Sequence, residues 1–182
     1  MIEDVTADAE RAAVQAFFSE HFDNIAPNAV PMADVDYLYA PLILRYVDQA
    51  TGELLGAGLS NRAAVAVASA TAQQMMGSDP LGYAKVLDAH SELDLLAVRR
   101  DVRGRGIGAQ LIDDMAQRLR ARGVRAWFGN VTPNLDVEGL SRFYARNGFR
   151  VGALDAPIPP LLGKDWTMPA TEAAAFYFWR RL

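Results

Sequence analysis

The sequence predicts a mixed α/β (α+β) fold, in which helices flank a sheet of parallel and antiparallel strands. The main support is a strand, a helix and a second strand over Glu92–Val131, because such a unit normally joins parallel strands by a right-handed crossover. The apolar runs Leu42–Val47 and Leu54–Ser60 are separated by turn-forming residues and predict an antiparallel pair. The length of 182 residues suits one domain with a single core.

The remaining elements follow from hydrophobic periodicity and from the residues that end helices. In chain order we expect helices over Asp8–Phe22, Ala63–Met76, Pro80–His90, Ile107–Leu119 and Asp136–Asn147, and strands over Val124–Val131, Phe149–Gly152 and Ala173–Arg180. Residues 63–90 are therefore expected to form a helical insert, and residues 153–171 a proline-rich loop, within one domain that spans 1–182.

Composition narrows the class of protein. Half of the residues are hydrophobic (51%) and 22% are charged, which is typical of a globular chain. The net charge of −4 leaves no global basic field, so we expect no nucleic-acid partner. The most apolar run, Ala63–Ala72, is shorter than the roughly 20 residues that cross a bilayer. The acidic start, Met1–Asp8, does not resemble a signal peptide, so we expect a cytoplasmic protein without a membrane partner.

The cysteine and histidine content limits the catalytic and metal-binding sites that the chain can form. The chain has no cysteine, which excludes disulfides, thiolate metal ligands and a cysteine nucleophile. Only two histidines are present, His21 and His90, so we expect no metal site, and we expect His90 to be a surface or capping residue.

The most informative segment is a glycine-rich turn between the strand that ends at Val98 and the helix that follows. It reads Arg103-Gly104-Arg105-Gly106-Ile107-Gly108, and Arg99 and Arg100 precede it. Glycines allow close backbone approach, and a helix N-terminus presents unpaired N–H groups, so this turn suits a pyrophosphate. A tight turn with a solvated arginine face is the alternative. The Walker and dinucleotide patterns are disfavoured, because Ala109 follows the last glycine and the glycine spacing does not match.

These residues resemble the acetyl-CoA signature of the GCN5-related N-acetyltransferases (GNAT family). In that family the signature reads Gln or Arg, two residues, Gly, one residue, and Gly or Ala, as Arg103-x-x-Gly106-x-Gly108 does here. The later segment Phe143-Tyr144, three residues, Gly148-Phe149 is similar to a second family element. The resemblance covers Glu92–Val151 well, and the N-terminal third matches only in its order of elements.

The resemblance implies a mostly antiparallel sheet with a central, splayed pair of parallel strands, and acetyl-CoA as co-substrate. The backbone of Leu96, Ala97 and Val98 would pair with the pantetheine arm. The residues expected to hold the pyrophosphate are Arg103, Gly104, Arg105, Gly106, Ile107 and Gly108. Family members often have an asparagine seven residues before the tyrosine; that position is Val137 here, so Asn134 or Asn130 is expected to supply the cofactor contact.

Two residues are candidates for catalysis by the same resemblance. Tyr144 matches the family tyrosine that protonates the departing CoA thiolate, and its alternative role is that of a half-buried helix residue. Glu92 stands where some members carry a catalytic glutamate, and could deprotonate the amine directly or through water. Glu92 could equally be a polar residue on the exposed half of a strand, and Asp94 is expected on the same strand face.

The implied function is an N-acetyltransferase that transfers acetyl from acetyl-CoA to a primary amine by direct attack in a ternary complex. A CoA-binding sensor or regulatory domain without transfer activity is the alternative, and a plain interaction domain is a third reading. The acceptor is not specified, although Met75, Met76 and Tyr83 of the insert could line its site. We expect a monomer or a homodimer, in which the aromatic strand Phe176–Trp179 could pair across the dimer.

Overall fold

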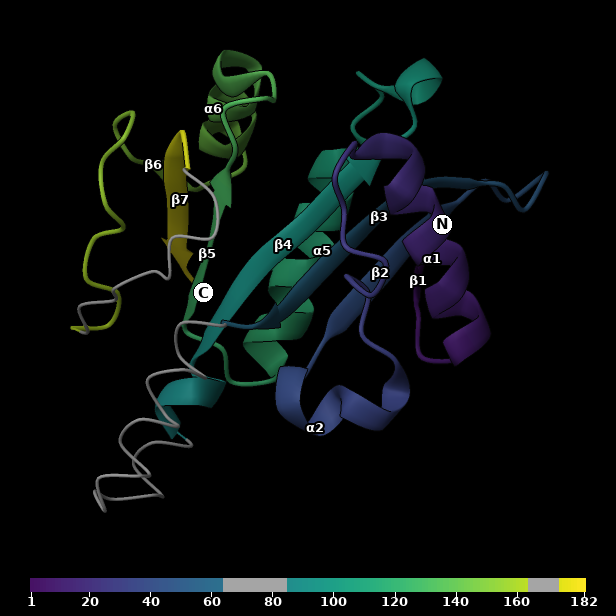
Figure 1. Cartoon of the computed structure of the whole chain (residues 1–182), viewed down its shortest axis with the longest axis horizontal. Coiled ribbons are helices and arrows are strands. Elements are labelled where there is room, and N and C mark those ends of the chain that lie inside the picture. Colours follow the sequence, from purple (N-terminus) through teal and green to yellow (C-terminus); the bar gives the residue numbers. More distant parts are fainter. Residues whose placement is uncertain (64–84, 164–173) are drawn as a thin grey trace. The chain divides into compact units, whose positions relative to one another are not determined.

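The computed structural model describes residues 1–63, 85–163 and 174–182 (Figure 1). The chain forms a seven-stranded sheet with the order β1-β2-β3-β4-β5-β7-β6. It divides into two compact units, of which the first contains Met1–Asn61 and Asp94–Arg118 and the second contains Arg62–Leu93 and Leu119–Leu182. Strand β4 (His90–Val98) therefore contributes residues to both units.

The first unit contains the N-terminal half of the sheet and the helices around it. Its elements are β1 (Ile2–Asp4), α1 (Asp8–His21), the 3-10 turn Ala33–Val35, α2 (Asp36–Tyr39), β2 (Leu42–Val47), β3 (Leu54–Arg62, as far as Asn61), the later part of β4, the 3-10 turn Arg100–Val102 and α5 (Ile107–Ala121, as far as Arg118). Strand β2 pairs antiparallel with both β1 and β3, so the predicted pair is confirmed and extended by β1.

Helices α1 and α5 cover opposite faces of this part of the sheet (Figure 1). Phe18 of α1 packs in one hydrophobic cluster with Leu59 of β3 and Ala97 of β4. Met115 of α5 instead packs over Gly58 of β3. Because side chains alternate along a strand, neighbouring positions of β3 bury one helix on each face.

An ion pair between buried Arg11 and the more exposed Asp36 ties α1 to the chain before β2. Arg11, which is 4% exposed, donates two hydrogen bonds to the carboxylate of Asp36 at 2.6 and 2.8 Å. Its guanidinium also donates to the backbone carbonyls of Thr6 and Pro31. The ion pair with Asp36 raises the pKa of Arg11, although burial opposes this shift. This network anchors the α2 segment, whose helices the sequence did not predict.

The second unit contains β5 (Ala126–Val131), α6 (Val137–Arg146), β6 (Arg150–Val151) and β7 (Phe176–Arg181), together with the first residues of β4. Strands β4 and β5 are parallel, as predicted. His90 pairs with Ala126 at one end of the paired stretch, and Glu92 pairs with Phe128 at the other. Strand β7 is antiparallel to β5 on one side and to β6 on the other. The mixed, mostly antiparallel sheet and its parallel pair are thereby confirmed.

Several sequence expectations need correction. His90 is not a surface residue, because it is 3% exposed, although Nδ1 does cap the carbonyl of Val86 at 2.7 Å. Strand β7 is also a poor candidate for pairing across a dimer. Phe178 and Trp179 have β5 on one side and β6 on the other, so their backbone groups already have partners. The expected helices of the insert lie mostly outside the described residues, as do Met75, Met76 and Tyr83.

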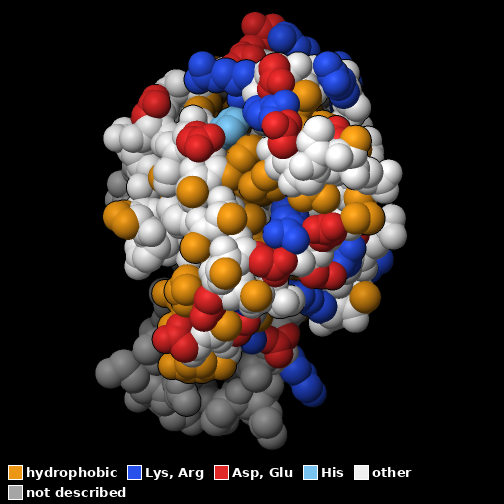
Figure 2. Space-filling view, turned by 90° about the vertical axis from the view of Figure 1, so that its right-hand side faces the viewer, with side chains coloured by type: hydrophobic (Ala, Val, Ile, Leu, Met, Phe, Trp, Pro, Cys, Tyr) orange, Lys and Arg blue, Asp and Glu red, His pale blue; other side chains and the backbone are white. Residues whose placement is uncertain are grey.

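The surface agrees with the modest net charge. Figure 2 shows acidic and basic side chains intermixed on one face, without a field of a single sign. Within residues 1–63, 85–163 and 174–182, no helix combines the length and the apolar character needed to cross a membrane.

Candidate active site

The glycine-rich turn links β4 to α5 within the first unit. Gly104 and Gly106 have φ angles of 78° and 80°, in the left-handed region that glycine adopts without steric cost. Arg103 adopts an extended conformation, and α5 begins at Ile107. The backbone N–H groups of residues 104–108 make no hydrogen bond to any described part of the chain. These N–H groups therefore suit an anion at the positive end of the α5 dipole.

The four arginines around this turn do not have equal roles. Arg99 is bound by two carboxylates, because its Nε lies 2.7 Å from Asp101 and its Nη1 lies 3.0 Å from Glu53. These ion pairs raise the pKa of Arg99 and lower the pKa of Asp101. Arg103 donates from Nε to the carbonyl of Val98 at 3.0 Å, which joins the turn to the end of β4. Arg99 is thus a structural residue rather than an available anion ligand.

Tyr144 lies on α6 in the second unit and is 6% exposed. Its ring stacks on Phe178 of β7, with centroids 3.6 Å apart and an interplanar angle of 11°, and it meets Phe149 edge to face. Asp136 caps α6 by accepting a hydrogen bond from the Gly139 N–H at 2.9 Å. Burial raises the pKa of Tyr144 above its ordinary value of 10.0, so the phenol stays protonated at neutral pH. Tyr144 is therefore packed among aromatic rings and protonated.

Glu92 lies on the other face of the sheet. It pairs with Phe128 of β5, whereas the neighbouring residue, Trp127, packs with Phe149 on the Tyr144 side. Tyr177 of β7 shares the face of Glu92, since burial and then the negative charge of Glu92 raise the pKa of Tyr177. Alternation along the strands therefore places Glu92 and Tyr144 on opposite faces.

The other predicted cofactor residues lie on β4 and in the chain before α6. Leu96 and Val98 are half-buried and Ala97 is 6% exposed, all in the later part of β4. Asn134 is exposed in the chain before α6, where its Oδ1 accepts a hydrogen bond from the Thr132 hydroxyl at 2.6 Å. Asp94 is exposed.

Sequence reasoning missed two residues that hold the tyrosine in place, Phe178 and Gly129. A Cβ atom at Gly129 would lie 2.5 Å from Phe178 Cζ and 2.8 Å from the Leu93 carbonyl oxygen. The continuous aromatic run of residues 176–179 carried a signal for Phe178, but the need for a glycine opposite it follows only from the β5–β7 register. Within the described ranges, no three His, Cys, Asp or Glu side chains gather as metal ligands do.

The comparisons with known proteins agree with this architecture. Residues 61–151, half of the chain, match the model of the acetyltransferase (GNAT) domain. No curated protein shows significant sequence similarity to the chain.

Three solved structures share the fold at low sequence identity. Ard1 from Thermoplasma volcanium matches with a TM-score of 0.64 and 15% identity, covering 100% of this chain and 97% of its own. The yncA protein from Salmonella typhimurium, solved with its cofactor acetyl-CoA, matches with a TM-score of 0.64 and 14% identity. The match covers 100% of this chain and 92% of the yncA chain. An aminoglycoside 6'-N-acetyltransferase complexed with coenzyme A matches with a TM-score of 0.60 and 10% identity. The match covers 100% of this chain and 96% of the other chain. The chain matches the domain model over half of its length, and it has the glycine-rich turn before α5 and the buried tyrosine of α6. It therefore belongs to the GNAT family of acetyltransferases.

Proposed function

We propose that this chain transfers the acetyl group of acetyl-CoA to a primary amine by direct attack, with both substrates bound at once. The observation that carries the proposal is the turn before α5, where two glycines have positive φ and a row of N–H groups has no partner among the described residues. This arrangement suits the pyrophosphate of CoA. The exposed side chain of Arg105 adds positive charge to this turn. The backbone of Leu96, Ala97 and Val98 is the proposed partner of the pantetheine arm.

In the proposed reaction the neutral amine attacks the thioester carbonyl, and the carbon–sulfur bond then breaks. Tyr144, which burial keeps protonated, donates its phenolic proton to the departing thiolate. Because burial also makes the phenol a weaker acid, this transfer accompanies the breaking of the carbon–sulfur bond, when negative charge develops on the sulfur. Glu92 takes the proton that the attacking amine loses, directly or through water. Since these two side chains lie on opposite faces of the sheet, the amine and the thiolate are proposed to approach and leave from different sides.

The absence of cysteine bears on mechanism and on the assay. An acetyl-cysteine intermediate is impossible, so initial rates should give intersecting lines when the two substrates are varied together. A thiol reagent will detect released CoA without any background from the protein, which makes a screen of primary amines direct. Parallel lines in the rate plot would contradict the ternary complex.

Calorimetric titration with acetyl-CoA tests the cofactor site independently of the acceptor. Micromolar binding together with amine-dependent CoA release would support the proposal. Binding without release by any amine in the screen would favour the sensor reading, and no binding up to millimolar concentration would favour an interaction domain. The proposed location is the cytoplasm, and the proposed assembly is a monomer or a homodimer.

A further inference from the structure

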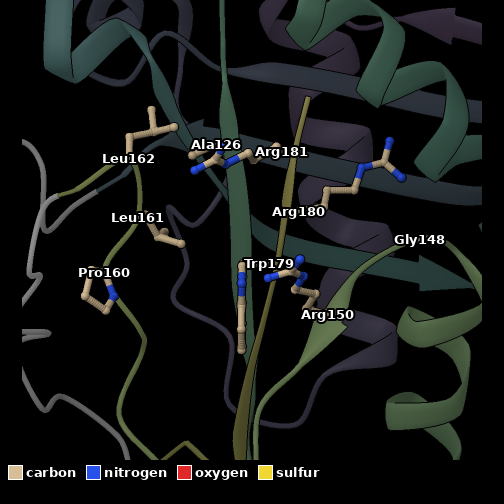
Figure 3. Close-up of a pocket in the computed structure, with 9 residues that line it drawn as sticks. All are labelled: Ala126, Gly148, Arg150, Pro160, Leu161, Leu162, Trp179, Arg180 and Arg181. Atoms are coloured by element: carbon tan, nitrogen blue, oxygen red, sulfur yellow. The ribbon is translucent and has the colours of Figure 1, made fainter.

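The second unit contains a cavity of about 460 Å³ that the proposed reaction does not use (Figure 3). Its lining includes Ala126, the first residue of β5, and Arg181, the residue of β7 that pairs with it. The cavity therefore lies at the start of β5, whereas Tyr177 pairs near the other end of that strand. Small-molecule sites commonly have volumes of roughly 300–1,000 Å³, and this cavity falls within that range.

Three side chains of the cavity share one face of the sheet. Arg150 of β6 pairs with Trp179 of β7, and Arg181 lies two residues after Trp179. Paired residues and residues two apart on a strand point to the same side, so the side chains of Arg150, Trp179 and Arg181 start from one face of the sheet. Arg150 lies beside Trp179, and Arg181 lies beside Ala126 (Figure 3). Arg180 extends away from the loop that carries Pro160 and Leu161 (Figure 3), and its guanidinium lies over the ring of Trp127.

The charge of the cavity contrasts with that of the chain. None of its lining residues in the described parts of the chain is acidic, although the net charge of the protein is −4. Arg150 and Arg181 have no ion pair with any residue in 1–63, 85–163 or 174–182. Six arginines elsewhere have carboxylate partners: Arg11, Arg45, Arg62, Arg99, Arg118 and Arg142. An anion would neutralise cations that line the same cavity.

The wall opposite the arginines is apolar. Pro160, Leu161 and Leu162 lie on the loop beside the sheet, and Leu161 is buried in the cluster that Trp179 also contacts. Leu162 has a φ of 50°, in a region that residues with side chains rarely adopt. An apolar ring or chain could pack against the surface that this loop and the indole form together, while its charged group meets the arginines.

We propose that this cavity binds a small organic anion, a carboxylate or a phosphate monoester with an apolar ring or chain, at a site separate from the acetyl-CoA turn. The guanidinium groups of Arg150 and Arg181 bind the anionic group, and Trp179 with the 160–162 loop binds the apolar body. This inference does not depend on acetyl transfer.

The test is calorimetric titration of the full chain, in the presence of saturating acetyl-CoA, with three probes: 2-naphthoate, 2-naphthyl phosphate and the neutral 2-naphthalenemethanol. At least one anion should bind with a Kd tenfold or more below that of the alcohol. Arg150→Gln and Arg181→Gln should each weaken that anion at least fivefold. Arg146→Gln is the matched control, because Arg146 is an exposed arginine of α6 outside the cavity, and it should leave the Kd unchanged.

The two anions distinguish the ligand classes, since tighter binding of the phosphate or of the carboxylate identifies the preferred group. Thermal unfolding of each variant separates lost binding from lost structure, and Arg150→Lys with Arg181→Lys should retain part of the affinity by keeping the charge. Equal binding of the alcohol and both anions would overturn the inference. So would equal affinities of the Arg150, Arg181 and Arg146 variants, or displacement of the anion by acetyl-CoA in a titration without saturation.

Discussion

Tyr144 is packed among aromatic rings, and its burial keeps the phenol protonated. Its ring stacks on Phe178 and its burial raises its pKa. Phenylalanine would keep the stacking and lose only the hydroxyl, so Tyr144→Phe isolates the proton.

We predict that Tyr144→Phe lowers kcat by about 100-fold, since general acid catalysis is commonly worth a factor of 10² or more. The KM for acetyl-CoA should change less than about twofold if binding does not use the hydroxyl. Tyr46→Phe, which changes a half-buried tyrosine of β2, serves as the control. Steady-state kinetics between pH 7 and 10 measure both variants, and an unchanged kcat throughout would remove the acid role.

The turn before α5 depends on a backbone conformation that only glycine adopts freely. A Cβ at Gly106 would meet only Gln110 Nε2, at 3.8 Å, so Gly106→Ala acts through φ rather than through a clash. We predict at least a tenfold loss of acetyl-CoA affinity, about 1.4 kcal/mol. Gly123→Ala imposes comparable strain at φ 88°, beyond the other end of α5, and should not change the Kd. Equal Kd values for the two variants in calorimetry would contradict the turn assignment.

At the scale of elements, the Phe178 ring of β7 lies against Gly129 of β5, and Tyr144 stacks on that ring. Gly129 makes this possible, because any side chain there would meet Phe178 and the Leu93 carbonyl. We predict that Gly129→Ala lowers the free energy of unfolding by about 1–3 kcal/mol, the usual cost of overpacking. It should also lower kcat through displacement of Phe178. Denaturant unfolding and near-UV circular dichroism measure these effects, and a variant as stable as the parent would show that β5 tolerates the methyl group.

His90 joins β4 to the turn of helix before it, and burial lowers its pKa below the ordinary 6.5, against the effect of backbone hydrogen bonds with Val86 and Leu161. The unfolded chain therefore binds the proton more readily than the folded one. Stability is complete above about pH 6.5 and falls as the pH decreases towards the folded pKa.

We predict that the free energy of unfolding falls more steeply between pH 7 and 5 in the parent than in His90→Gln, by at most about 1.4 kcal/mol per pH unit. His21→Gln keeps His90 and should retain the steeper slope. Urea unfolding at several pH values measures this difference. Identical slopes for the parent and His90→Gln would show that His90 titrates alike in both states.

At the scale of the whole molecule, cofactor binding should stabilise the folded chain by mass action. We predict that acetyl-CoA at 100 times its Kd raises the free energy of unfolding by about 2.7 kcal/mol. For a chain of 182 residues this corresponds to an increase in Tm of roughly 5–10 °C. Scanning calorimetry measures the shift, with Gly106→Ala at the same concentration as the control. An unchanged Tm in the parent would count against cofactor binding.

Local patterns in the sequence determined most of the elements and the class of the candidate site. The helix at Asp8–His21, the strand at Leu42–Val47 and the helix at Val137–Arg146 follow from hydrophobic periodicity, which acts between near neighbours in the chain. The glycine-rich turn and its helix were also visible locally, and they led to the GNAT family. Strand β1 escaped prediction because three residues carry too little pattern.

Tertiary structure decided everything that depends on which distant segments meet. The placement of Glu92 and Tyr144 on opposite faces follows from strand register. Residues far apart in the sequence form the ion pair between Arg99 and Glu53, and packing between such residues buries His90. The cavity beside Trp179 arises in the same way, since its arginines come from β6 and β7. Sequence periodicity encodes the faces of single elements, whereas the pairing of those faces is set only when the chain buries them together.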